Sequence, residues 1–229
     1  MSAPGTREAE LAKLLENTFR HVNIALVNEL AIYCHELGID VWSVIDAAAT
    51  KPFGFMKFTP GPGVGGHCLP VDPSYLSWRV KRRIGNTFRF VELANEVNDH
   101  MPAYVVRRIG DQLNRDEHAL HGSRVLVLGL AYKPNTGDAR ESPSLPVIEG
   151  LRRQGAVVAV AEPHVDALGL DPEIERVSCT VEEVRKADVV VVITDHDEFD
   201  YDMVQREAAR IFDTRNRYRG ESAANVERL

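Results

Sequence analysis

The feature that most restricts how this chain can fold is a loop in its first third that ends in a cysteine. The run FTPGPGVGGHC, from Phe58 to Cys68, holds four glycines and two prolines. Proline lacks an amide donor and glycine weakens helices and strands alike, so this run is neither a helix nor a central strand. It can bring bare backbone close to a ligand and hold a thiol beside it, with Asp72 four residues on. A structural turn with a buried, inert cysteine is the alternative, and spacing alone leaves both open.

Helical periodicity surrounds the loop on both sides. Apolar residues recur at three- and four-residue spacing over 8–37, 39–49, 74–84 and 87–114, which predicts four helices. Gly38 is expected to end the first helix, and Pro102 to break or kink the last. The polar segment 114–123 is the predicted domain boundary. We therefore expect a disordered start over 1–6 and a helical central domain over 7–115.

Beyond the boundary, short apolar runs alternate with helical patterns. Strands are expected over 124–130, 157–161, 188–194 and 210–213, with helices over 143–154, 182–186 and 201–206 between them. This alternation predicts an α/β domain over 120–229 with a doubly wound parallel sheet. Ligands of such sheets bind beyond the carboxyl ends of the strands, where Lys133 and Arg140 fall.

Composition excludes several classes of function. The net charge of −7 offers no basic surface for nucleic acid or an anionic membrane. The three cysteines are widely spaced and odd in number, and no pair has the spacing of zinc ligands, so neither a disulfide framework nor a metal site is expected. The longest apolar run is far too short for a membrane span, and the start does not resemble a signal peptide. A reducing cytoplasm is the compartment these features favour.

Three ordered segments carry a family resemblance. They are KPFGFMKFTPGPGVGGHCLPVDPSYLSW from Lys51, ELAKLLEN from Glu10, and GLAYKPNTGDARESP from Gly129, with FDTRN from Phe212 fitting as well. Together they resemble the NAD-dependent nucleotide-sugar 6-dehydrogenases, the UDP-glucose/GDP-mannose dehydrogenase family. The resemblance is strongest to the branch that oxidises UDP-N-acetylglucosamine, and it extends from about residue 8 to residue 218.

One part of the family pattern is not found. Members begin with a Rossmann domain that carries G-x-G-x-x-G after its first strand, whereas this sequence has no such fingerprint. The chain is therefore expected to be the C-terminal half of a dehydrogenase. Its main NAD-binding domain is expected to be absent, and the chain to be inactive alone.

The resemblance implies a set of catalytic residues. Cys68 would attack the C6 aldehyde to form a thiohemiacetal, which is oxidised to a thioester and then hydrolysed by water. Lys13 and Asn17, four residues apart on one helical face, would stabilise the oxyanion, position water and favour the thiolate. Asp72 would activate or orient the water. His67 would be only a structural neighbour.

The resemblance also implies binding residues. The backbone of Thr59, Gly61, Gly63 and Gly65 would lie along the UDP-sugar, Lys133 would meet its pyrophosphate, and Arg215 would face the same cleft. Arg140 would contact NAD across a domain interface, oriented by Glu141. A homodimer is expected through 87–114. His164 and the pair His196-Asp197 are interpreted as loop residues without a role.

The function that the resemblance favours is NAD-dependent oxidation of a UDP-sugar at C6, which would supply polysaccharide or glycoside precursors. UDP-N-acetylglucosamine is the favoured substrate. The alternatives are a non-catalytic UDP-sugar-binding and dimerisation module, or one half of a split dehydrogenase. A cysteine hydrolase built on Cys68 and His67 is disfavoured, because adjacent residues of an extended loop point apart.

Overall fold

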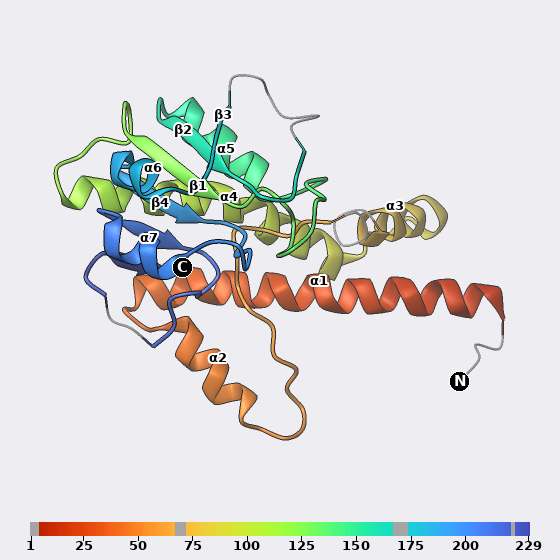
Figure 1. The fold of residues 1–229 in the computed structure, drawn as a ribbon. Coiled ribbons are helices and arrows are strands. Elements are labelled where there is room, and N and C mark those ends of the chain that lie inside the picture. The colour runs from red at the N-terminus through yellow and green to blue at the C-terminus, as the bar shows by residue number, and fades with distance from the viewer. Residues whose placement is uncertain (1–4, 67–71, 167–173, 221–222) are drawn as a thin grey trace. The chain divides into compact units, whose positions relative to one another are not determined.

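The computed structural model describes residues 5–66, 72–166, 174–220 and 223–229 (Figure 1). The chain forms two compact units. The helical unit comprises Met1–Pro60 and Val64–His100, and the sheet unit comprises Gly61–Gly63 and Met101–Leu229. The division falls inside one helix, α4 (Arg89–Arg115), rather than in the polar segment 114–123. The second half of α4 lies in the sheet unit because its apolar residues pack there.

The helical unit contains α1 (Thr6–Glu36), α2 (Val41–Ala49), α3 (Asp72–Ile84) and the first half of α4. These bounds lie close to those that apolar periodicity predicts. Gly38 has a φ of 67°, a left-handed conformation that ends α1. Asp40 then caps α2, since its Oδ1 accepts a 3.2 Å hydrogen bond from the amide of Trp42. The predicted disorder over 1–6 falls mostly outside the described residues, and α1 already includes Thr6.

Helix α4 is continuous, so the break predicted at Pro102 is wrong. Pro102 removes one backbone donor, but the flanking turns are held by the fully buried side chains of Met101, Tyr104 and Val105. Further along, the Arg108 guanidinium is also buried. It donates hydrogen bonds to Glu227 Oε1 at 2.8 Å and to the carbonyl oxygen of Arg228 at 3.1 Å.

The sheet unit is built on six parallel strands in the order β3-β2-β1-β4-β5-β6. Their bounds are β1 (Arg124–Leu128), β2 (Val157–Ala161), β3 (Glu175–Val177), β4 (Val189–Val192), β5 (Ile211–Asp213) and β6 (Val226–Arg228). The helices between them are α5 (Ser144–Arg153), α6 (Val181–Lys186) and α7 (Tyr201–Glu207). The doubly wound parallel sheet predicted from the alternating pattern is thereby confirmed, although the sequence did not predict the edge strands β3 and β6.

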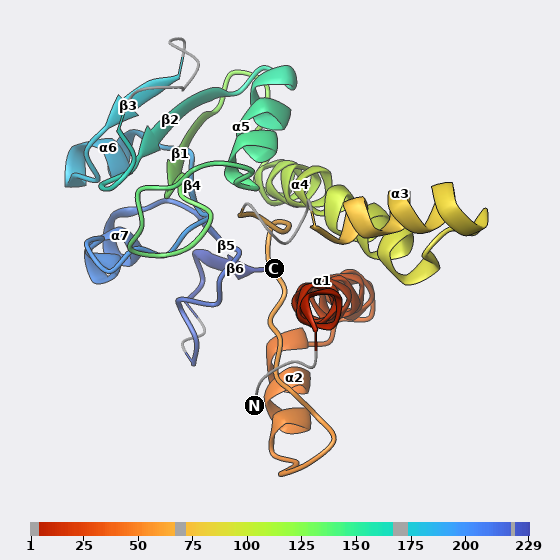
Figure 2. The ribbon, with the colours of Figure 1, turned by 90° about the vertical axis from the view of Figure 1, so that its right-hand side faces the viewer.

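Helices cover both faces of this sheet (Figure 2). One face, with Leu126, Ala159 and Val190, packs against α6 and α7 in a single apolar cluster. On the other side of the strands lie α5 and the second half of α4, where Gly150 permits close approach to Val106. Parallel strands buried on both faces are apolar throughout, as the all-valine β4 illustrates. Among the described residues, no helix is both long and apolar enough to cross a membrane.

Candidate functional site

Two of the four predicted catalytic residues cannot be placed. Cys68 lies outside the described residues, and so does the side chain of Asp72, although α3 begins at Asp72. The other two lie one turn apart on α1 but at different depths. The Lys13 side chain is 60% exposed and its Nζ lies 3.1 Å from Glu16 Oε2, whereas Asn17 is only 4% exposed. Their catalytic roles remain predictions.

Asn17 begins a polar stripe on α1 that continues through His21 and Asn28, all of them buried. His21 and Asn28 belong to a chain of hydrogen bonds with Asn95 and Asn98 of α4 and with Ser74 in the first turn of α3. The distances are 2.9 Å from Asn28 to Asn98, 3.4 Å from Asn98 to His21 Nδ1, 2.8 Å from His21 Nε2 to Asn95, and 3.1 Å from Asn95 to Ser74.

The donors and acceptors of this hydrogen-bond chain can be assigned. Asn95 donates its amide to Ser74, so its carbonyl oxygen is what faces His21, and His21 must carry its proton on Nε2. Its Nδ1 is then free to accept from Asn98. No local sequence pattern predicted this buried hydrogen-bond chain, which reaches the first turn of α3, shortly after the cysteine loop.

The predicted ligand loop and the predicted basic residue Arg215 come together within the sheet unit. Gly61 is buried against Arg215, and a Cβ on Gly61 would stand 2.8 Å from Arg215 Nη1. The guanidinium is held in turn, because its Nε donates to the carbonyl oxygen of Ile193 at 2.6 Å. Burial lowers the pKa of Arg215, while Asp195 and Asp213 oppose that shift.

The other residues of the predicted ligand loop differ in exposure. Thr59 is exposed, whereas Gly63 and Gly65 are half-buried. The loop therefore changes from an exposed start to a buried contact at Gly61. Substrate contacts of its backbone remain a prediction.

Lys133 and Arg140 lie on the segment that follows β1, and both are exposed. Lys133 Nζ lies 5.4 Å from the ring centre of Tyr132. Arg140 is held by a two-pronged contact with Asp138, at 2.9 Å from Nε to Oδ1 and 2.7 Å from Nη2 to Oδ2. The hydrogen bond with Asp138 raises the pKa of Arg140. The carboxylate that holds Arg140 is thus Asp138, and an orienting role of Glu141 toward the basic groups of the site stays a prediction.

Glu162, at the carboxyl end of β2, is the centre of the second buried polar network. It accepts five hydrogen bonds of 2.6–3.2 Å from the segments after β1, β2 and β4: from the amides of Leu130, Ala131, His164 and Val165 and from His196 Nε2. Burial by itself raises the pKa of this carboxyl, but the hydrogen bonds from His196 and the backbone amides outweigh it and lower the pKa to about 2. Glu162 is therefore ionised and fixes the ends of three strands.

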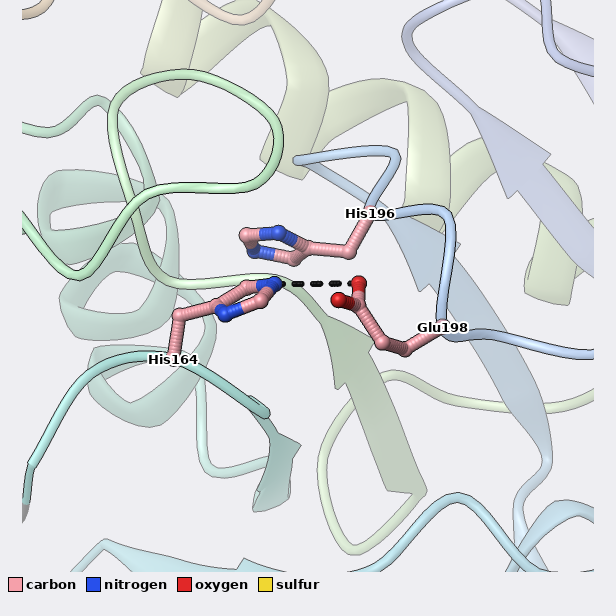
Figure 3. A group of neighbouring side chains, drawn as sticks. All are labelled: His164, His196 and Glu198. Carbon is pink, nitrogen blue, oxygen red and sulfur yellow. Dashed lines mark ion pairs between the residues drawn. The ribbon is translucent and has the colours of Figure 1, made fainter.

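His196 is fully buried and uses both ring nitrogens, contrary to the interpretation of this residue as part of a loop without a role. Its Nδ1 accepts the amide of Asn135 at 3.0 Å, and its Nε2 donates to Glu162. The rings of His164 and His196 lie 4.8 Å apart, and His164 Nε2 lies 3.0 Å from Glu198 Oε2 (Figure 3).

The group His164, His196 and Glu198 is compact enough to hold a metal ion. A metal ligand needs a nitrogen lone pair directed at the ion, and His196 has none to spare, because Nδ1 accepts from Asn135 and Nε2 carries a proton toward Glu162. The hydrogen bonding therefore argues against a metal centre in this group.

The turn after β1, where a doubly wound sheet would cradle a dinucleotide, does not fit NAD. Gly129 has a φ of 88°, and the space beside its Cα is filled by Thr194, whose carbonyl oxygen would stand 2.3 Å from an added Cβ. The next two amides, of Leu130 and Ala131, already donate to Glu162 and cannot bind a phosphate. Arg140, which is among the described residues, is the residue that the sequence predicts to contact NAD.

Two family models match the chain in order. Residues 7–100 match the central domain of the UDP-glucose/GDP-mannose dehydrogenase family, and residues 126–220 match its UDP binding domain. The second match runs from Leu126 of β1 through β5 and includes Lys133, Arg140 and Arg215.

Known proteins resemble the chain over most of its length. It is 41% identical to UDP-N-acetyl-D-mannosamine dehydrogenase of Methanococcus maripaludis over 192 residues, which is 83% of this chain and 42% of that protein. It is 36% identical to NDP-N-acetyl-D-galactosaminuronic acid dehydrogenase of Ralstonia solanacearum, over 95% of this chain and 50% of that protein.

Among solved structures, that of UDP-D-ManNAc dehydrogenase from Pyrococcus horikoshii superposes with a TM-score of 0.79 at 30% identity, over 98% of this chain and 52% of that one. The chain thus spans about half the length of the relatives that it matches. With both domains matched in order and a fold shared with these relatives, the chain belongs to the UDP-glucose/GDP-mannose dehydrogenase family.

Proposed function

We propose that this chain supplies the nucleotide-sugar half of an NAD-dependent dehydrogenase that oxidises C6 of a UDP-N-acetylhexosamine. Both relatives named above carry an N-acetylated sugar in their names, which supports this class of substrate. Within the class, the segment KPFGFM favours UDP-N-acetylglucosamine. Because the turn after β1 does not fit NAD, no hydride-transfer step is assigned to the described residues.

The observation that carries the proposal is the contact between Gly61 and Arg215. It joins the glycine loop to the carboxyl end of β5, which is the side of a parallel sheet where ligands bind. Glycine leaves room for backbone to approach a ligand, and a guanidinium held by the carbonyl oxygen of Ile193 presents fixed donors. Lys133, exposed after β1, adds a second positive charge suited to a pyrophosphate.

Calorimetric titration of the chain with UDP tests the proposal without any need for turnover. We expect wild type to bind UDP more tightly than ADP. We expect Arg215→Met and Lys133→Met each to weaken binding about tenfold, because each removes a charged hydrogen-bond partner. Gly61→Ala should also weaken UDP binding, since the new methyl group would displace Arg215.

The matched control is Gly110→Ala in α4, where the added Cβ would make an ordinary 3.8 Å contact with Leu120. It should leave UDP binding unchanged. Absence of UDP binding by a folded wild-type chain would refute the proposal. Titration with UDP-N-acetylglucosamine, UDP-N-acetylmannosamine, UDP-N-acetylgalactosamine and UDP-glucose then identifies the sugar, and UDP-glucose is expected to bind the weakest of the four.

Cys68 is the proposed nucleophile, and it can be probed as a thiol. The other two cysteines are poor competitors, because Cys34 is buried and burial raises the pKa of Cys179 to about 11. We expect iodoacetamide at pH 7.5 to label Cys68 before the other two, as read by peptide mass spectrometry, and UDP-sugar to slow that labelling. Labelling of Cys68 no faster than Cys179 would favour the non-catalytic binding module.

We further propose that the chain forms a homodimer through α1. Large apolar side chains lie exposed along this helix and at its C-cap, at spacings of four and seven residues: Leu11, Leu15, Phe19, Leu26, Tyr33 and the C-cap Leu37. A second copy of the same helix could cover such a stripe in a two-fold contact. The segment expected from sequence, 87–114, is less suitable because most of its apolar residues, including Tyr104 and Ile109, are already buried within the chain.

Sedimentation equilibrium tests this interface. Wild type is expected to be a dimer at micromolar concentration, and Leu26→Glu to be a monomer, because a charge would be buried at the centre of the contact. Glu29→Gln, on the same helix, is the control and should leave the dimer intact. A monomeric wild type would refute the proposed dimer.

A further inference from the structure

Asn135 fastens the segment that carries Lys133 to the segment after β4, in addition to the hydrogen bond that Thr194 Oγ1 donates to the carbonyl oxygen of Ala131 at 2.6 Å. The amide of Asn135 donates to His196 Nδ1 at 3.0 Å, and its side-chain nitrogen donates to Asp197 Oδ2 at 2.7 Å. In return, the amide of Asp197 donates to Asn135 Oδ1 at 3.0 Å. Asn135 has a φ of 57°, a left-handed conformation that asparagine tolerates better than most residues. Three hydrogen bonds thus fix the backbone two residues beyond Lys133.

The hydrogen bond from Asn135 to His196 depends on which ring nitrogen of the neutral imidazole carries the proton. Nδ1 can accept only when the ring proton is on Nε2, and Glu162 selects that form by accepting from Nε2 at 3.0 Å. Glu162 is itself held by four backbone amides. A continuous relay therefore runs from a fixed carboxylate, through one imidazole, to the backbone beside Lys133.

We propose that Asn135 and His196 are positioning residues of the nucleotide site, which hold the Lys133 segment in place for the pyrophosphate. This rests on the proposed role of Lys133. A ring without a lone pair at Nδ1 could not accept from the amide of Asn135, so the hydrogen bond between them would be lost.

His164 lies beside the relay without belonging to it. Its ring centre lies 4.8 Å from that of His196, with the two ring planes tilted by 52°, and its Nε2 pairs with Glu198 at 3.0 Å. On another side of His196, the ring of Phe199 makes an edge contact at 5.7 Å. The carboxylate that faces His196 Nε2 is that of Glu162.

The test is the affinity for UDP, measured by calorimetry at pH 8. His196→Phe keeps the ring volume but removes both nitrogens, so it should bind UDP about tenfold more weakly than wild type, which corresponds to the loss of one charged phosphate contact. Asn135→Gly keeps the left-handed backbone but loses the clamp to Asp197, and a several-fold weakening is expected.

His164→Phe is the matched control. It changes the neighbouring imidazole, which lies outside the relay, and should bind UDP as tightly as wild type at pH 8. Hydrogen exchange gives a second measurement that does not need UDP: peptides covering 131–137 should exchange faster in His196→Phe than in His164→Phe at one pH. If wild type binds no UDP, the proposed function is refuted. Faster exchange of 131–137 in His196→Phe would then still show that His196 holds this segment in place.

The inference is overturned if His196→Phe and Asn135→Gly bind UDP as tightly as wild type does. Equal exchange of 131–137 in the two phenylalanine variants would likewise overturn it.

Discussion

In the helical unit the central buried polar side chains are neutral, whereas in the sheet unit they surround a charge. The chain from Asn28 to Ser74 passes through amides, one imidazole and a hydroxyl. Glu162 instead collects five donors around one ionised carboxylate. Both arrangements keep buried polar atoms hydrogen-bonded, which is the condition for burying them at all.

The two units should therefore tolerate different substitutions. A neutral chain loses the energy of ordinary hydrogen bonds when one link is cut. A buried carboxylate is stable only while its hydrogen-bond donors compensate for the lost hydration. Replacing the carboxylate leaves several buried donors without an acceptor, which costs more than cutting one neutral link. The two tryptophans, Trp42 and Trp78, both lie in the helical unit, so their fluorescence reports that unit separately.

The largest effect is expected from Glu162→Gln. An amide cannot accept five hydrogen bonds, and its NH₂ group would face backbone donors, so the sheet unit should lose about 3 kcal/mol or more. Urea unfolding followed by hydrogen exchange of β1, β2 and β4 measures the loss. The matched control is Glu198→Gln, a half-exposed carboxylate whose replacement is expected to leave the stability of the sheet unit nearly unchanged. Equal losses in the two variants would remove the distinction between the units.

A smaller loss is expected from His21→Leu, which preserves volume but leaves Asn95 Oδ1 and the Asn98 amide without their partner. The helical unit should lose about 2 kcal/mol, measured by the urea dependence of tryptophan fluorescence. His35→Leu, at an exposed position of the same helix, is expected to change stability by less than about 0.5 kcal/mol. A loss at His21 as large as that at Glu162 would contradict the comparison.

Acidification should separate the two units further. Burial lowers the pKa of His21, with Asn95 and Asp99 opposing the shift, so the unfolded chain takes up this proton first. The helical unit should therefore lose stability as the pH falls below about 6.5, by at most about 1.4 kcal/mol per pH unit.

For Glu162 the folded pKa is about 2 against an ordinary value of 4.5, so its stabilisation persists until the pH falls through that interval. Acid unfolding can be followed by tryptophan fluorescence for the helical unit and by hydrogen exchange for the sheet unit. The helical unit should unfold at the higher pH. His21→Leu should remove the early part of that transition. Unfolding of the sheet unit at a higher pH than the helical unit would contradict this prediction.

The smallest effect is expected from Ser74→Ala, which removes only the terminal link of the neutral chain. A loss of about 0.5–1 kcal/mol is typical of one hydrogen bond between neutral groups. The measurement is again tryptophan fluorescence in urea. Asn23→Ala is the control, because the Asn23 side chain is exposed and bonds only to the backbone of its own helix. A larger effect at Ser74 would show that the chain acts cooperatively.

The sequence predicted the helices and central strands because their apolar residues repeat with the periods of those elements. It did not predict β3 or β6, which are three residues long and rich in charge. Resemblance pointed to Gly61 and Arg215, and the structure brings them together. The two buried networks were not predicted, since hydrogen bonds between residues such as Glu162 and His196 leave no local pattern.

Two signals in the sequence were nevertheless present. Asn17, His21 and Asn28 recur at spacings of four and seven, which places polar side chains on one face of a helix that is otherwise amphipathic. Glu162 and His196 each follow a buried strand, at the edge of the sheet where functional side chains gather.

The pairing of Arg108 with the last strand has a consequence for the order in which the molecule is assembled. Its guanidinium partners, Glu227 and Arg228, are 119 and 120 residues further along the chain. A nascent polypeptide can complete the helical unit early, but it must hold this arginine unpaired until β6 has been synthesised. Contacts of such long sequence separation form slowly. Closure of the sheet edge is therefore expected to be the last step of folding, and the one at which a chaperone would find apolar surface exposed.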